Sequence, residues 1–346
     1  MEEASQYDET RRHSRRPLIA RTVRSLLPLP AIACFVLSLS ACDRFQRPRT
    51  AFNGEASLAY VRAQLAFGPR VPGSRAHERA GDWIVAQMKQ RTDSVVVQSW
   101  AHVTATGDTL RLRNVLARIN PTATQRVLYL THWDTRPTAD EDMNLGNKRL
   151  PIQGANDGAS GVALLMGIAD ALKTTRPLYG VDLLFVDGED YGSFDGYNAD
   201  SALTKHYDVL IGSTYFAQHL PSADYRPIFG ILFDMIGDKD LQIYQESNSV
   251  AAAPEIVARV WSTAEELGYG KYFLNVNKGA ITDDHVPLLK RGLRVIDVID
   301  IDYCTEGIDC VGTPRNLHHT MQDVLANVSA RSLQIVGDVA VALVTR

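Results

Sequence analysis

Cysteine is scarce in this chain of 346 residues, which contains four. Two of them, Cys34 and Cys42, lie in an Arg-rich N-terminal segment, so Cys304 and Cys310 alone remain for the rest of the chain. This scarcity excludes a metal site built from clustered cysteine ligands. Cys304 and Cys310 form either a disulfide or two free thiols, because the sequence does not give the Cα separation that decides between them.

Basic residues are not in excess either. The formal net charge is −4, and residues 1–42 contain six Arg and four acidic residues, so this segment carries +2 and the remainder −6. A body this acidic argues against a nucleic acid as partner. Internal repeats, low-complexity tracts and a second composition regime are also lacking, so we expect residues 53–346 to form a single domain.

The chain has little that could span a membrane. The apolar stretch 26–41 is short and is interrupted by Pro28 and Pro30, but the six Arg before it are typical of a signal peptide. It ends in Leu39-Ser40-Ala41-Cys42, which resembles the bacterial lipobox, where the cysteine is acylated. We therefore expect a lipoprotein-type signal peptide at 1–42, a linker at 43–52, and an exported, periplasmic protein that contacts the membrane only through a lipidated Cys42. An ordinary cleavage site or an uncleaved anchor are the alternatives.

Apolar strands alternate with amphipathic helices along most of the body. This alternation, after a hairpin at 95–119, predicts an α/β fold. The expected helices cover 56–67, 77–90, 162–172, 253–267 and 329–344, and the expected strands cover 95–100, 110–119, 127–131, 181–186, 227–233 and 293–299. Residues 193–215 read as a long insertion whose aromatic residues line a pocket or pin the loop to the body.

Acidic and imidazole side chains follow several of these strands. The strand 181–186 runs into Asp187-Gly188-Glu189-Asp190, His132 follows 127–131, and Asp234 follows 227–233. Ligands of α/β sheets bind outside the carboxyl ends of the strands. Asp157 lies in a loop of small residues before a helix, and His319 follows the Cys304–Cys310 region. Carboxylates and imidazoles form the ligand set of catalytic zinc sites, which use three protein ligands and keep one position open.

The order of the motifs gives a closer identification. They resemble the M28 zinc peptidase clan, and within it the bacterial members of the glutaminyl-peptide cyclotransferase branch, from about Phe52 to the C-terminus. The resemblance rests on Phe-Gly-Pro-Arg-Val-Pro-Gly-Ser at 67–74, His-Trp-Asp-Thr-Arg-Pro at 132–137, Gly-Ala-Asn-Asp-Gly-Ala-Ser-Gly at 154–161, Asp-Gly-Glu-Asp at 187–190, Asp-Met-Ile-Gly at 234–237, Asp-Asp-His at 283–285 and His-Thr-Met at 319–321.

This resemblance implies a three-layer sandwich with a central mixed, mostly parallel twisted sheet and helices on both faces. It also implies one zinc held by Asp157, Asp190 and His319, and a reaction in which an N-terminal Gln of a peptide or protein becomes pyroglutamate with release of ammonia. Glu189 would be the general acid/base. Asp234 and Asp283 would form a hydrogen-bond network that tunes the pKa of Glu189.

A two-zinc M28 aminopeptidase is the alternative. In that enzyme His132 and Asp234 bind a second metal, Asp157 bridges the two ions, and Glu189 activates a water. All five ligands are present, so ligand count does not separate the two activities, whereas Asp283-Asp284-His285 and Arg136-Pro137 favour the cyclase. A catalytically dead binding domain is a third class, and the intact Glu189 argues against it.

The chain also departs from the animal cyclases at three positions. It has His318 where they carry Trp, Asp297 where they carry His, and Asp190 where they carry Glu. The resemblance therefore does not fix the pocket for the Gln side chain.

Overall fold

The computed structural model describes residues 50–346, so the expected signal peptide, Cys42 and most of the linker lie outside the described residues. Within this range the strands form a six-stranded sheet with the order β1-β2-β4-β3-β5-β8. Its members are β1 (Ser94–Val103), β2 (Thr109–Ile119), β3 (Arg126–His132), β4 (Gly180–Val186), β5 (Phe229–Asp234) and β8 (Val295–Ile299). β1 and β2 form the expected antiparallel hairpin at the edge, β2 is antiparallel to β4, and β4, β3, β5 and β8 run parallel. The mixed, mostly parallel sheet is confirmed.

The parallel strands are buried on both sides. Every residue of β3, β4 and β5 is buried, as expected for strands whose sequences are nearly continuous apolar runs. β1 instead leaves several residues exposed, including Val96 and Val97. Strand β4 thus lies inside the sheet, and the acidic turn that follows it is attached to a rigid element.

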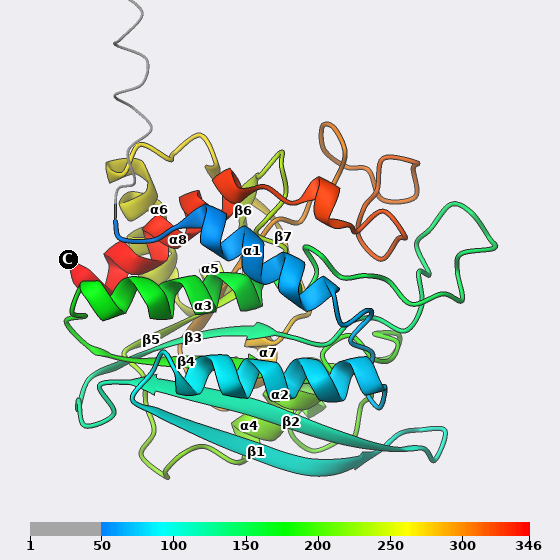
Figure 1. Cartoon of the computed structure of the whole chain (residues 1–346), viewed down its shortest axis with the longest axis horizontal. Coiled ribbons are helices and arrows are strands. Elements are labelled where there is room, and N and C mark those ends of the chain that lie inside the picture. Colours follow the sequence, from blue (N-terminus) through cyan, green and yellow to red (C-terminus); the bar gives the residue numbers. More distant parts are fainter. Residues whose placement is uncertain (1–49) are drawn as a thin grey trace, which may run out of the picture. The chain divides into compact units, whose positions relative to one another are not determined.

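Helices cover both faces of the sheet, which confirms the three-layer prediction (Figure 1). A large apolar cluster joins one face of the sheet to α1 (Gly54–Leu65), α2 (Arg75–Lys89), α3 (Ala159–Thr174), α6 (Pro254–Glu266) and α8 (Ala330–Thr345). A second cluster joins the other face to α4 (Ile211–Gln218) and α7 (His285–Lys290). Helix α3 is apolar almost all round because it contacts the sheet as well as α1 and α8.

Several elements were not predicted. The region 193–215 contains the short 3-10 helix η2 (Ala199–Ser201) and the start of α4, and a parallel pair of strands, β6 (Ile243–Glu246) and β7 (Phe273–Gly279), forms a second small sheet. Helix α5 (Ser247–Ala252) follows β6, and η3 (Leu325–Asn327) precedes α8. β6 is too short to show a period, and β7 is polar and half exposed, so neither carries the alternation on which strand prediction depends.

Two further features complete the fold. Cys304 and Cys310 are joined in a disulfide with their Cα atoms 6.1 Å apart, so the paired state is the one observed. Among residues 50–346, no helix combines the length and the apolar character needed to cross a bilayer.

Candidate metal and acid-base site

The predicted site residues meet at one edge of the sheet. His132 and Asp234 are the last residues of β3 and β5, and Glu189 and Asp190 follow β4. Because these strands are parallel, their carboxyl ends lie at the same edge. A cavity of about 450 Å³ opens there, and its walls include Asp157, Glu189, Asp190, Asp234, Asp283 and His319. His132 lies fully buried beside it.

Asp157, Asp190 and His319 form a triad whose ligand atoms all lie within 4.8 Å of one another. His319 Nε2 lies 3.6 Å from Asp157 Oδ2 and 3.3 Å from Asp190 Oδ1. Asp157 Oδ2 and Asp190 Oδ2 are buried and have no hydrogen-bond partner. Buried carboxylate oxygens without a donor are costly, and a cation between them removes that cost. Two carboxylates and one imidazole also match the donor set of an open zinc site, so this triad fits the metal.

His132, Asp157 and Asp234 form a second triad with the same spread of ligand atoms. Here, however, the side chains bind one another, because His132 Nε2 lies 3.1 Å from Asp157 Oδ1 and 3.2 Å from Asp234 Oδ1. Burial lowers the pKa of His132, but the charge of Asp234 and hydrogen bonds to its acidic neighbours outweigh burial and hold the pKa well above its ordinary value. A raised pKa favours the protonated imidazole, whose single positive charge offsets one of the two carboxylate charges of this triad, and a metal here would have to displace that proton.

Glu189 is a buried carboxyl group with little to stabilise its charge. Burial raises its pKa well above the ordinary value, and the charges of Asp190, Asp283 and Asp284 raise it further, against a lowering effect of His132. The pKa of Asp283 is also raised, first by burial and then by the charges of Asp234 and Asp284. Carboxyl groups whose pKa values move toward neutrality are suited to general acid-base catalysis.

Local backbone geometry aims the acidic turn after β4. Asp134 accepts the N–H of Glu189 at 3.1 Å and the N–H of Asp190 at 3.3 Å, so one carboxylate fixes both residues. Gly158, which follows Asp157, has φ +85°, and a Cβ there would lie 2.8 Å from Asp134 O and 3.1 Å from His132 Cε1. Glycine at this position allows Asp157 to approach β3 closely.

Arg136 supports the first triad, a role that the sequence did not reveal. Its Nη1 donates to Asp190 Oδ1 at 2.6 Å, and its Nε and Nη2 donate to the two oxygens of Asp140 at 2.7 and 2.8 Å. The guanidinium therefore occupies Oδ1 of Asp190, whereas Oδ2 has no hydrogen-bond partner. Arg136 belongs to the His132–Pro137 motif, which carried the family signal without a role for this residue.

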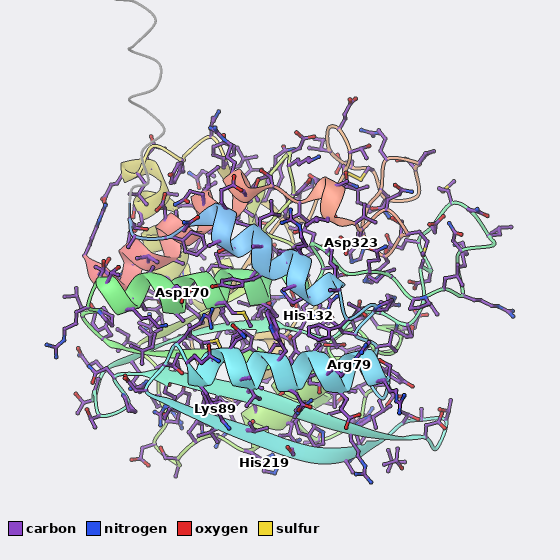
Figure 2. The ribbon with its side chains drawn as sticks, viewed as in Figure 1. Arg79, Lys89, His132, Asp170, His219 and Asp323 are labelled. Carbon is purple, nitrogen blue, oxygen red and sulfur yellow. A yellow bond between two sulfur atoms is a disulfide. The ribbon has the colours of Figure 1, made fainter. Side chains whose placement is uncertain are left out.

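Asp323 and Arg70 fix the loop that carries Asp157. Asp323 accepts the N–H of Asn156 at 2.8 Å and that of Asp157 at 3.2 Å, while fully buried Arg70 donates to the carbonyls of Gln153 and Gly154, both at 2.7 Å. Figure 2 labels Asp323, in the segment that precedes α8, and His132 at the end of β3. Sequence reasoning missed Asp323 because one acid in a polar loop carries no pattern.

Two of the residues that differ from the animal cyclases, His318 and Asp297, have different positions relative to the cavity. His318 lines the cavity, stacks on His319 with ring centroids 3.6 Å apart, and lies 3.1 Å from Glu141 Oε1. Asp297 is buried behind the cavity wall and does not line it. Of the aromatic residues in the insertion, Phe194 lines the cavity, Tyr197 packs on Tyr207, and Tyr215 stacks between Trp100 and His219.

Comparison with known proteins agrees with this geometry. Residues 114–344 match the model of peptidase family M28. The glutaminyl cyclase of Porphyromonas gingivalis is 36% identical, with a TM-score of 0.77, and the similarity covers 85% of this chain and 98% of that one. A Zn-dependent exopeptidase from Parabacteroides distasonis is 35% identical, also with a TM-score of 0.77, over 85% of this chain and 99% of that one.

Curated relatives match over shorter stretches. The glutaminyl-peptide cyclotransferase of Bos taurus is 26% identical over 258 residues, which make up 66% of this chain and 68% of the bovine protein. For two other curated relatives, the match covers only 49% and 38% of the relative's own length.

Proposed function

The chain belongs to peptidase family M28, and from this we propose that it is a zinc-dependent glutaminyl-peptide cyclotransferase, which converts the N-terminal Gln of peptides to pyroglutamate. One observation carries the proposal: the buried carboxyl of Glu189 lies beside a triad with unpartnered oxygens, whereas the neighbouring triad is bridged by His132. That arrangement suits one metal and one acid-base group. The glutaminyl cyclases among the solved relatives support the same activity.

Asp157, Asp190 and His319 would hold the zinc. When bound, the ion would supply Lewis acidity toward the γ-carbonyl of the substrate Gln. The names of related zinc metalloproteases and of a Zn-dependent exopeptidase support the choice of metal. The proposal of a single ion rests on the internal bonding of the His132 triad.

Glu189 would move the proton. The α-amine nitrogen forms a bond to the γ-carbonyl carbon, the bond from that carbon to the amide nitrogen breaks, and ammonia leaves. Glu189 accepts a proton from the α-amine and returns it to the departing nitrogen, for which a raised pKa is an advantage. Asp234 and Asp283 line the same cavity, and the charge of Asp283 contributes to that raised pKa.

A mass measurement tests the activity. Purified protein is incubated with a peptide that begins with Gln, and the product is weighed. Loss of one ammonia with the peptide length unchanged supports the cyclase, and a free amino acid with a shortened peptide contradicts it.

The second candidate is a two-zinc aminopeptidase. The second triad and the similarity to the Zn-dependent exopeptidase favour it. Its substrate would be a peptide N-terminus, Glu189 would take a proton from water, and the same assay would release the first residue.

We also propose that the protein is exported and anchored to the periplasmic side of a membrane through a lipidated Cys42, as Leu39-Ser40-Ala41-Cys42 predicts. The variant Cys42→Ala should be released from membranes or keep its leader, in membrane fractionation followed by mass spectrometry. A mature N-terminus elsewhere without lipid mass would contradict this.

A further inference from the structure

Glu246 is a buried carboxylate outside the cavity, with no role in the proposed reaction. It is the last residue of β6, it is fully buried, and it does not line the cavity. It pairs in the small sheet with Gly279 of β7. The segment after Gly279 leads to Ile281, Thr282 and Asp283, which all line the cavity.

Both oxygens of Glu246 accept several hydrogen bonds. Oε1 accepts the N–H of Asn248 at 2.7 Å and that of Ile281 at 3.0 Å. Oε2 accepts the N–H of Ser249 at 2.6 Å and its hydroxyl at 2.7 Å, and lies 3.3 Å from His285 Nε2. Burial raises the pKa of Glu246, but the nearby charge of His285 and the backbone N–H donors outweigh burial and lower the pKa to about 2. The carboxylate is therefore ionised throughout the pH range of activity assays.

Hydrogen bonds at one end and an ion-pair contact at the other hold the segment 281–285. At its start, Glu246 binds the N–H of Ile281, while Asn248 Nδ2 donates to the carbonyl of Ile281 at 2.9 Å. At its end, His285 lies against Glu246. Asp283 lies between these two anchors, two residues from each.

The same carboxylate is linked to β8. Ser249 Oγ donates to Glu246 and accepts the N–H of Asp297 at 2.9 Å. Asp297 Oδ2 lies 3.8 Å from His285 Nδ1, so His285 is enclosed between two carboxylates. The buried carboxylate of Glu246 thus connects the segment 281–285, helix α5 and strand β8.

We infer that Glu246 is a positioning residue for the acid-base site, and that it fixes the segment 281–285 so that Asp283 is held in the cavity. It acts without touching the substrate. The inference rests on the proposed function for the choice of the assayed reaction and for the role of Asp283.

The variant Glu246→Gln tests this, because Gln keeps the shape but offers one acceptor oxygen in place of two. We expect kcat per bound zinc to fall about 10- to 100-fold, the size of effect that a misplaced catalytic group produces, with KM and zinc content close to wild type. Glu246→Asp keeps the charge and both oxygens, so it should recover part of kcat. Asn248→Ala removes the bond to the Ile281 carbonyl and should lower kcat in the same direction, and it serves as the test if Glu246→Gln does not fold.

Asp338→Asn is the matched control. Asp338 is equally buried and accepts bonds from a backbone N–H, a hydroxyl and a phenol, but on α8. The variant Asp338→Asn should lower the melting temperature and leave kcat per bound zinc unchanged. The inference is overturned if Glu246→Gln and Asn248→Ala behave like this control. Wild-type protein is assayed first, so that failure to release ammonia from a Gln-initiated peptide rejects the proposed function and is not confused with a result on Glu246.

Discussion

Glu189 and Asp190 are neighbours in sequence, yet their carboxyl groups have different surroundings. Asp190 pairs with Arg136 at 2.6 Å and lies 3.3 Å from His319 Nε2, so it is already held in place as a ligand would be. For the Glu189 carboxyl, the contact with His132 is a long one, at 4.0 Å. One carboxylate is anchored and the other is free to exchange a proton.

Substitution should separate these two roles. Glu189→Gln keeps the shape but cannot accept a proton, so kcat should fall by about 10² to 10⁴, the usual contribution of acid-base catalysis, with zinc content unchanged. Asp190→Asn should instead lower the zinc content, because it weakens a ligand. Metal analysis and steady-state kinetics on both variants check this. Near-normal cyclisation by Glu189→Gln would move the base to Asp234 or Asp283.

Asp238 should make stability depend on pH. Burial raises its pKa to about 7, against the backbone N–H donors that lower it, so the folded state holds a proton that the unfolded state loses near pH 4. The contribution of Asp238 to the free energy of unfolding is therefore fully present below about pH 4, and it is lost as pH rises toward 7. Asp238→Asn keeps the shape without the charge, so relative to wild type it should gain about 4 kcal/mol at most between these limits. Urea unfolding at both pH values measures the gain, and an equal difference at both would contradict it.

At the scale of elements, the sequence predicted those helices and strands best whose residues follow one clear hydrophobic pattern. The strands that became β3, β4 and β5 are apolar runs of ordinary length, and each ends in a polar residue or is followed at once by one, so both the strands and the site at their carboxyl ends could be predicted. The ligand roles came from the family motifs, because no spacing in the chain brings Asp157 and His319 together.

The supporting elements could not be predicted in the same way. β6 and α5 are four and six residues long, and the buried carboxylate of Glu246 at their junction contacts distant Ile281 and His285. Arg136 and Asp323 likewise act through contacts between segments far apart in the chain. Local propensity does not contain such contacts.

The disulfide loop gives a prediction at this scale. Val311, next to Cys310, is exposed and lines the cavity. Cys304→Ser with Cys310→Ser should lower the free energy of unfolding by about 2 kcal/mol, the chain-entropy value for so short a loop, and should raise KM for peptides more than it lowers kcat. Thermal unfolding and kinetics check both effects. A change in kcat alone would show that the loop contributes to the chemistry and not to substrate binding.

At the scale of the whole molecule, the three residues proposed to hold the zinc come from distant parts of the chain. Asp157 precedes α3, Asp190 follows β4, and His319 lies in the segment before α8. A ligand that binds only the folded state stabilises the whole of it, by an amount that grows with the logarithm of its affinity. Removing zinc should therefore lower the melting temperature of the whole domain as well as abolish activity.

Adding zinc back to metal-free protein gives the number of ions. If the proton on His132 keeps a metal out of its triad, one equivalent of zinc added to metal-free protein should restore both the melting temperature and the activity. His132→Ala should then keep the single zinc, since Asp157 Oδ2, Asp190 and His319 remain. It should still lose part of its activity, because the pKa of Glu189 depends on the charge of His132. Calorimetric titration with metal analysis measures both. If full activity requires two equivalents, and His132→Ala loses one of them, the second triad is a metal site and the aminopeptidase assignment replaces the cyclase.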